Sequence, residues 1–193
     1  MGEFNLSATG EHLTVRALRP DDLGFIRSLA QDERVVRFVG DGKPWTDAYL
    51  QRRFADALAS GGTSDRETRW FIAETAAETA AGAAGAAGAA ESTAVGLLAL
   101  TLRPAETEVG YWVVPEEWGK GYATRLVEHG VILAGELRPA VPLVATILRD
   151  NVASRRVVEH VGFTTEPAVT ADSAIESTAE MTYRRSPPRV PSE

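Results

Sequence analysis

Gly119 and Gly121, two glycines with a single residue between them, follow a run of alternating apolar residues and precede a helical pattern. Glycine lets the backbone turn sharply and leaves room for a ligand, while the first turn of a helix leaves N–H groups without intrahelical partners. This combination suits an anion such as phosphate. The same glycines also fit an ordinary turn between a strand and a helix, so the pair by itself leaves both interpretations open.

The segments on either side of these glycines have the periodicities of a strand and a helix. Residues 107–114 alternate between two faces, and Pro115 removes the backbone donor that would continue the ladder. We therefore expect the strand to end there. Beyond the glycines, a helix that begins near Tyr122 has one apolar face. That face consists of Ala123, Leu126, Val127, Val131 and Ala134.

Two motifs in the order of a known family make the interpretation specific. The strand carries Gly110-Tyr-Trp, the turn reads Trp118-Gly-Lys-Gly-Tyr-Ala, and Asn151-Val-Ala-Ser-Arg-Arg precedes Gly162-Phe. In these motifs the chain resembles the GNAT superfamily of acetyl-CoA-dependent N-acetyltransferases, and more narrowly the branch that includes the ribosomal-protein alanine N-acetyltransferases. The likeness runs from Leu13 to about Tyr183. It implies an α/β (α+β) fold, with a mixed, mostly antiparallel sheet of six to seven strands flanked by about four helices.

The resemblance also implies acetyl-CoA as co-substrate. Val113 and Val114 would pair through their backbone with the pantetheine arm, and one of their N–H groups would face the thioester oxygen. Trp118 stands where the family commonly has Gln or Arg, a change we expect to be tolerated because the contact rests on main-chain donors. The pyrophosphate would be held by the main chain of Gly119, Lys120, Gly121, Tyr122, Ala123 and Thr124.

Two further residues are candidates for coenzyme contacts. Asn151 precedes a helical pattern, with Ser154 three residues later, which suits a helix N-cap. In the resembled family the matching Asn hydrogen-bonds the pantetheine or cysteamine portion, so both roles stay open. Arg156 is a candidate partner for a coenzyme phosphate, against the alternative of a solvated arginine on a helix surface.

Acetyl transfer to an amine needs a base for the ammonium group and an acid for the departing thiolate. Glu108 begins the central strand, and a glutamate at the corresponding place is the base in several relatives, often through a water. Its alternative is a solvated carboxylate at a strand end. Many GNAT enzymes carry an acidic tyrosine four residues before the closing Gly-Phe, but Val158 occupies that position here. Ser154 lies on the same helical face and matches the serine of the N-terminal acetyltransferase branch.

The remaining elements frame these residues. Asp21 or Asp22 is expected to cap a helix, the segment from Val35 to Trp45 is expected to be a loop, and Thr46 is expected to cap a second helix. In the resembled family this pair of helices and its loop form part of the acceptor wall. Phe38 and Trp45 are therefore candidate substrate-facing aromatic residues, with burial in the core as the alternative.

Length and composition set wider limits. The 193 residues suit a single domain over 1–185, interrupted by an Ala/Gly-rich low-complexity loop over 75–92 and followed by a disordered tail over 186–193. The chain has no cysteine, no long apolar run and no metal-binding spacing among its three histidines. We therefore expect a cytoplasmic protein, monomeric or homodimeric, without a metal and without a membrane segment. A formal charge of −7 disfavours nucleic acid and mildly favours amine substrates.

Three functions follow from these patterns. The first is an acetyl-CoA-dependent N-acetyltransferase that transfers an acetyl group directly to a primary amine of a protein N-terminus or a small molecule. The second is a non-catalytic acyl-CoA-binding protein, which the absent tyrosine keeps open. The third is a dinucleotide-binding oxidoreductase, for which the glycine pattern fits poorly because Thr124 occupies the third glycine position.

Overall fold

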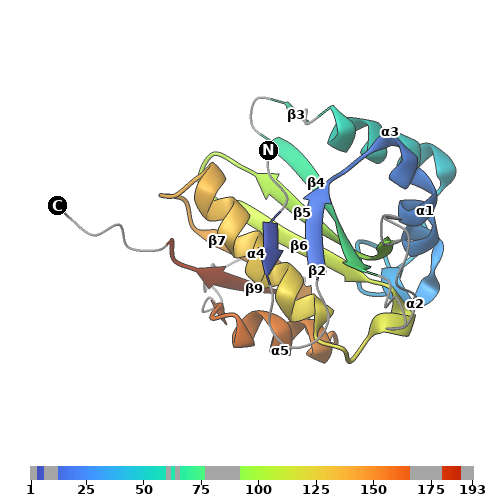
Figure 1. Ribbon diagram of the computed structural model, residues 1–193. Coiled ribbons are helices and arrows are strands. Elements are labelled where there is room, and N and C mark those ends of the chain that lie inside the picture. The colour runs from blue at the N-terminus through green and yellow to red at the C-terminus, as the bar shows by residue number, and fades with distance from the viewer. Residues whose placement is uncertain are drawn as a thin grey trace, which may run out of the picture.

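The computed structural model describes residues 4–6, 13–59, 62–63, 66–76, 92–165 and 180–187. In these ranges the chain forms one nine-stranded sheet in the order β1-β2-β4-β5-β6-β7-β9-β8, with β3 paired to β4 (Figure 1). All neighbouring strands are antiparallel except β6 and β7, which are parallel. This confirms the predicted mixed, mostly antiparallel sheet. The sheet has two strands more than the predicted maximum of seven, because β1 and β3 are only three and two residues long and too short to show an alternating pattern.

The strands are β1 (Phe4–Leu6), β2 (Leu13–Ala17), β3 (Gly62–Thr63), β4 (Arg66–Ala76), β5 (Ser92–Leu102), β6 (Thr107–Val113), β7 (Leu143–Leu148), β8 (Thr164–Thr165) and β9 (Glu180–Arg185). The helices are α1 (Leu23–Gln31), α2 (Glu33–Val36), α3 (Asp47–Leu58), α4 (Tyr122–Leu137) and α5 (Val152–His160). Two 3₁₀ turns cover Pro20–Asp22 and Pro115–Glu117. None of the described helices combines the length and the apolar character that crossing a bilayer requires.

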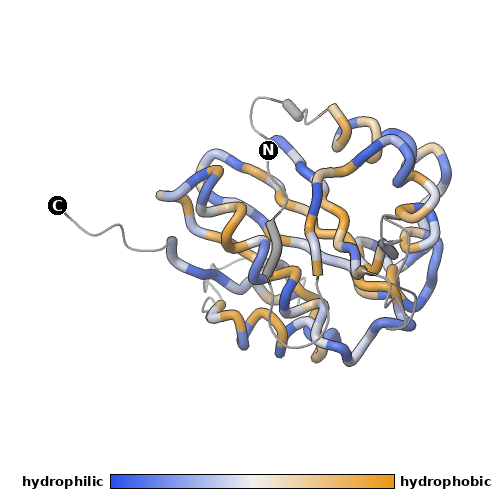
Figure 2. Tube along the Cα trace, in the orientation of Figure 1, coloured by the Kyte–Doolittle hydropathy of each residue, from blue (hydrophilic) through white to orange (hydrophobic). Residues whose placement is uncertain are grey.

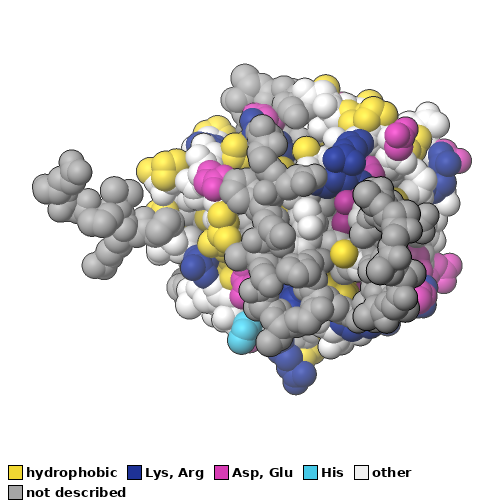
Figure 3. All heavy atoms as spheres, viewed as in Figure 1, with side chains coloured by type: hydrophobic (Ala, Val, Ile, Leu, Met, Phe, Trp, Pro, Cys, Tyr) yellow, Lys and Arg dark blue, Asp and Glu magenta, His cyan; other side chains and the backbone are white. Residues whose placement is uncertain are grey.

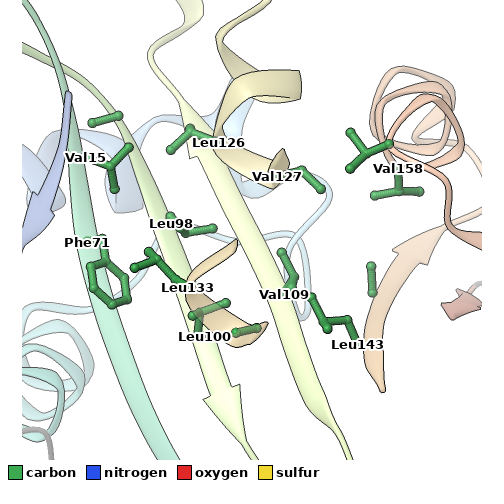
Figure 4. Close-up of a cluster of buried hydrophobic side chains, with 14 of the residues drawn as sticks. Val15, Phe71, Leu98, Leu100, Val109, Leu126, Val127, Leu133, Leu143 and Val158 are labelled. Carbon is green, nitrogen blue, oxygen red and sulfur yellow. The ribbon is translucent and has the colours of Figure 1, made fainter. Parts of the chain in front are cut away.

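Helices α4 and α5 cover one face of the sheet. Leu133 of α4 lies beside Leu98 and Leu100 of β5, and Val158 of α5 belongs to the same buried cluster (Figure 4). A Cβ at Gly130 would lie only 3.1 Å from a methyl group of Leu98, so this glycine lets α4 approach the sheet closely. The predicted helix is confirmed, and its close packing on β5 and β6 fixes where its N-terminus lies.

Helices α1, α2 and α3 cover the opposite face. Ile26 and Leu50 pack there against Trp70 and Ile72 of β4. Apolar segments accordingly run along the inner strands in Figure 2, while polar residues predominate on the outer surface of α3. On the face shown in Figure 3, Lys and Arg side chains lie among Asp and Glu side chains, so the described residues there form no continuous basic surface.

Two local expectations were wrong. The segment after Asp32 is not all loop, because the Asp32 side chain accepts from the Arg34 N–H and starts the short helix α2. Asp22 does not cap α1 through its side chain. Its carboxylate instead accepts two hydrogen bonds from Arg16, both 2.8 Å long, and one from the Arg19 N–H.

Thr46 does cap α3 as predicted, since its hydroxyl oxygen accepts from the Tyr49 N–H at 3.3 Å. Residues 77–91 of the predicted Ala/Gly-rich loop lie outside the described residues, as do residues 188–193 of the predicted tail. The division into a domain, an insert and a tail stays a prediction.

Candidate active site

Strands β6 and β7 begin as neighbours and then separate. Their recorded Cα partners are Thr107 with Leu143 and Glu108 with Val144, at the start of both strands. Further along, residues 109–113 of β6 and 145–148 of β7 both line one cavity of about 960 Å³. The sheet is therefore open between two of its central strands, and the opening widens toward the N-terminus of α4.

The register shows which backbone groups of β6 face this opening. The Val114 N–H donates to the Val95 carbonyl at 2.9 Å, so this pair is hydrogen-bonded. Because such pairs alternate in an antiparallel ladder, the main-chain groups of Tyr111 and Val113 point away from β5. Thr107 lies an even number of residues from Tyr111 and Val113, so its main chain points the same way, and its N–H donates to the Pro142 carbonyl on the β7 side at 2.9 Å. Tyr111 and Val113 thus turn their backbone toward the opening, whereas Val114 does not.

The turn that enters α4 lies at the wide end of the cavity. Gly119 and Gly121 have φ angles of +82° and +83°, a left-handed conformation that favours glycine. A Cβ at either position would meet no atom within 4 Å. Gly121 directly precedes α4 and has no side chain with which to cap it. The first helical turn and the open space above it fit the pyrophosphate cradle expected from the sequence.

The structure brings most of the predicted coenzyme residues to this cavity. Those that line it are Val113, Gly119, Gly121, Tyr122, Ala123, Thr124 and Asn151. Three others do not line it. The Val114 N–H belongs to the sheet, the Lys120 ammonium pairs with Glu117 at 2.8 Å, and Arg156 is exposed on α5. We therefore remove Val114 from the candidates for a main-chain contact, and Lys120 and Arg156 stay predictions without a cavity position.

The N-terminus of α5 forms a second wall. The Asn151 side chain accepts from the Ser154 N–H at 3.1 Å, which is the predicted N-cap. Asn151 and Ser154 both line the cavity, so the cap and a contact with the coenzyme are compatible roles. Trp118 is 49% exposed at the mouth, where its indole N–H donates to the Val113 carbonyl at 2.9 Å.

Glu108 lines the narrow end of the cavity and is ion-paired. Its Oε2 lies 2.6 Å from Nη2 of Arg103, which itself lines the cavity. Arg103 also contacts Glu106 at 3.4 Å, and Glu106 contacts Arg184 of β9 at 3.2 Å. The Glu108 carboxylate is thus one end of a network of alternating charge. Sequence reasoning missed Arg103, which is separated from Glu108 by the turn between β5 and β6.

Helix α2 and the turn after it form the wall opposite α5. Phe38 lines the cavity, as does Arg37, whose guanidinium carbon lies 4.3 Å from the Phe38 ring centroid. Trp45 instead packs against the hydrophobic core, the alternative expected from the sequence. Its ring lies 6.4 Å from that of the buried Trp70 and 5.0 Å from that of Trp112, measured between centroids. Of the two aromatic candidates, only Phe38 reaches the cavity.

A family model for the acetyltransferase (GNAT) domain matches residues 12–164 of this chain. The chain belongs to the GNAT family. A curated relative, the uncharacterized N-acetyltransferase YoaA of Bacillus subtilis (strain 168), is 29% identical over 72 residues. That match covers 37% of this chain and 41% of the relative, so it spans less than half of either protein.

Solved structures share the GNAT fold over most of the chain. A spermidine N-acetyltransferase from Vibrio cholerae, in complex with CoA and spermine, is 19% identical with a TM-score of 0.65, covering 89% of this chain and 92% of that one. An acetyl transferase from Salmonella typhimurium, which modifies the N-terminal serine of ribosomal protein L7/L12, is 14% identical with a TM-score of 0.62, covering 90% and 94%. At these identities the likeness shows the fold alone.

This GNAT domain has Val158 where many members have a tyrosine, and Val158 is fully buried against α4 and the sheet. A different phenol lies in the cavity. The Tyr111 hydroxyl, carried by β6, donates to the Ser154 carbonyl at 3.3 Å. Burial raises the pKa of Tyr111 to about 12, an effect that the Ser154 contact only partly offsets. The phenol therefore stays protonated and can donate a hydrogen bond at neutral pH.

Sequence reasoning gave Tyr111 no chemistry. A hydroxyl-bearing residue between Val109 and Val113, on a face that otherwise buries apolar side chains, was the available signal. A buried Tyr O–H usually has a polar partner. That partner, the Ser154 carbonyl, lies 43 residues away in sequence and could not be identified without the fold.

Proposed function

We propose that this GNAT domain is an acetyl-CoA-dependent N-acetyltransferase that transfers the acetyl group directly to a primary amine, of a protein N-terminus or of a small molecule. One observation carries the proposal: the opening between β6 and β7 ends at the left-handed Gly119–Gly121 turn. A strand whose backbone edge faces an opening that leads to the N-terminus of a helix suits an extended ligand with a phosphate group.

The residues that would hold acetyl-CoA follow from this geometry. The first turn of α4, from Tyr122 to Thr124, would bind the pyrophosphate through N–H groups. The backbone of Tyr111 and Val113 would pair with the pantetheine arm, and Asn151 would contact it from α5. When bound, acetyl-CoA supplies an activated acetyl thioester. The protein has to orient that group, take a proton from the amine and stabilise the departing sulfur.

Glu108 is our candidate for the group that accepts the ammonium proton. It lines the cavity on the α1–α3 side of β6, the side from which Phe38 and Arg37 also reach it. Arg103 holds the carboxylate at 2.6 Å and so fixes its orientation. The Tyr111 hydroxyl and Ser154 lie on the α4–α5 side, where Tyr111 would donate a hydrogen bond to the leaving sulfur and Ser154 would help to orient it.

The proposal is tested by measuring free thiol released from acetyl-CoA in the presence of a panel of amines and peptides, with mass spectrometry of the products. We expect thiol release that depends on an amine, and a product heavier by one acetyl group. If thiol appears only at the rate of spontaneous hydrolysis with every amine, the proposed function is wrong.

The ion pair between Arg103 and Glu108 favours a second candidate, an acyl-CoA-binding protein without turnover. The Arg103 guanidinium already occupies Oε2 of Glu108 at 2.6 Å, so this carboxylate has fewer free lone pairs with which to accept from a water or an ammonium group. Calorimetric titration with CoA separates the two candidates. Tight CoA binding without thiol release in the amine panel would favour the binding protein.

A further inference from the structure

The charged side chains on the acceptor side of the cavity are almost all paired. Among the described residues, Glu108 is the carboxylate on this side, and it pairs with Arg103 at 2.6 Å. Glu117, next to the glycine turn, pairs with Lys120 at 2.8 Å. A polycationic acceptor needs carboxylates that can turn toward it. These two are already engaged within the protein.

Two arginines of the α2 wall, Arg34 and Arg37, differ in whether carboxylates pair with them. Arg34 contacts Asp32 at 2.6 Å and Glu116 at 2.9 Å, so two carboxylates surround its charge. Arg37 lies one turn further along, at the C-terminal end of α2, and also lines the cavity. Among the residues that the structure describes, no carboxylate pairs with the Arg37 guanidinium. Its recorded contact is the Phe38 ring at 4.3 Å.

The Phe38 contact matters because it leaves the edge of the guanidinium available. An arginine stacked on an aromatic face keeps its N–H donors in the plane of the group, where they match the two oxygens of a carboxylate. The Arg37 N–H of the backbone also donates to the Glu33 carbonyl at 3.1 Å, which anchors the residue to α2. The wall thus presents an anchored cation whose charge no carboxylate of the described residues balances.

We propose that the acceptor is an amine that also carries a carboxylate, and that Arg37 binds this carboxylate while Glu108 receives the amine. The inference rests on the proposed function and narrows its substrate class. Two sources share this chemistry: a free amino acid and a peptide N-terminus with an acidic side chain nearby. A polyamine or an aminoglycoside has no such group and would leave Arg37 without a partner.

Matched acceptors test the proposal directly. Alanyl-glutamyl-alanine amide and alanyl-glutaminyl-alanine amide share the same N-terminal amine and differ by one carboxylate. We expect kcat/KM to be roughly 10- to 100-fold higher for the glutamyl peptide, the size of one charge-assisted hydrogen-bonded contact. Alanine and alaninamide form the amino-acid arm, and spermidine is the polycation. Preference within the peptide pair or within the amino-acid pair tells which source the site accepts.

Arg37→Met should abolish that preference, raising KM for the carboxylate-bearing acceptor while KM for acetyl-CoA stays unchanged. Arg37→Lys should restore part of it, because the charge remains and the paired donors are lost. The control is Arg52→Met: Arg52 also lies over an aromatic ring, that of Tyr49 at 5.2 Å, but on α3 outside the cavity. Arg52→Met should keep the wild-type preference.

The outcomes separate this inference from the proposed function. Amine-dependent thiol release that favours spermidine, or an Arg37→Met enzyme with unchanged preference, would overturn the acceptor class and leave the acetyltransferase intact. Absence of thiol release with every acceptor would overturn the proposed function itself.

Discussion

The two ends of the cavity are built by different means. The coenzyme end consists of main-chain groups from one nearly continuous stretch, 111–124, together with the start of α5. The acceptor end consists of side chains from three separate segments: α2 and its turn, the β5–β6 hairpin and the first residues of β6. A backbone site depends on φ angles and should tolerate changes of side chain, as we expect for Trp118. A side-chain site depends on which charges are already paired.

Different kinds of substitution should affect the two ends. At the coenzyme end, only a change that alters the backbone or fills the space above it should matter. At the acceptor end, a charge should matter for activity where its side chain lines the cavity. Of the network formed by Glu108, Arg103, Glu106 and Arg184, only Glu108 and Arg103 do so.

The largest effect is expected at the acceptor end. Glu108→Gln preserves size and hydrogen bonding but removes the proton acceptor, so kcat should fall roughly 10²- to 10⁴-fold while the Kd for acetyl-CoA is unchanged. The defect should shrink above the pKa of the acceptor amine, because a neutral amine needs no base. Steady-state rates measured from neutral pH to above that pKa check both statements.

Glu106→Gln is the matched control for this change. Glu106 shares the Arg103 guanidinium with Glu108 but does not line the cavity. Its removal should leave kcat near the wild-type value. If Glu108→Gln is as active as wild type near pH 7, or if its defect does not change with pH, Glu108 is only a carboxylate at the start of a strand.

The next effect is expected at the coenzyme end. Gly121→Val places a branched side chain in the open space above α4 and strains a φ of +83°, so affinity for acetyl-CoA should fall about 100-fold, the size of one lost charge-assisted hydrogen bond. Calorimetric titration measures it. Gly135→Val is the control within the same helix, where φ is not positive and no atom lies within 4 Å of the added Cβ. Unchanged affinity in a folded Gly121→Val protein would contradict the assignment of the pyrophosphate site to this turn.

A smaller effect is expected between the two ends. Tyr111→Phe removes the phenol O–H and should lower kcat roughly 10-fold with KM for acetyl-CoA unchanged, and Ser154→Ala should cost less. Because burial raises the pKa of Tyr111 to about 12, this residue should add no basic limb to the pH–rate profile below about pH 11. A Ser154→Ala defect larger than that of Tyr111→Phe would reverse the two roles.

The smallest effect on activity is expected far from both ends. Asp22 and Glu74 hold Arg16 at 2.8 and 2.6 Å in a mostly buried network, so Asp22→Asn should lower the free energy of unfolding by about 3 kcal/mol and leave kcat unchanged. Burial alone would raise the pKa of Asp22, but hydrogen bonds from Arg16 and from the Arg19 N–H outweigh it and lower the pKa below its usual value.

The sign of the pH dependence follows from that lowered pKa. Asp22 contributes stability at pH values above its unfolded pKa of about 3.9, and this contribution is lost as the pH falls through the lower pKa of the folded state. Urea unfolding of wild type and Asp22→Asn should therefore differ near pH 7 and converge in acid. A constant difference down to low pH would show that packing, and not the charge, accounts for the loss.

Local patterns in the chain were sufficient for the central elements. Alternation over 107–114, the break at Pro115 and the helical spacing after Gly121 predicted the bounds of β6 and the start of α4 within a residue. These patterns are reliable because each reflects a backbone period that neighbouring residues share. The caps at Thr46 and Asn151 are local for the same reason, since donor and acceptor lie three residues apart. The predicted side-chain cap by Asp22 is absent because its carboxylate accepts instead from the Arg16 guanidinium and the Arg19 N–H.

By itself, then, the sequence determined the periodic elements, the family resemblance and the glycine turn for the coenzyme. Only the tertiary structure decided which donors are free to act. Val114 lost its role because the antiparallel register directs its N–H to Val95, and Glu108 gained a cationic partner because a hairpin returns Arg103 to it. Arg37 and Tyr111 entered the site because the end of α2, strand β6 and the start of α5 line the same cavity. Such pairings depend on how distant segments are juxtaposed, and no local period in a sequence encodes that.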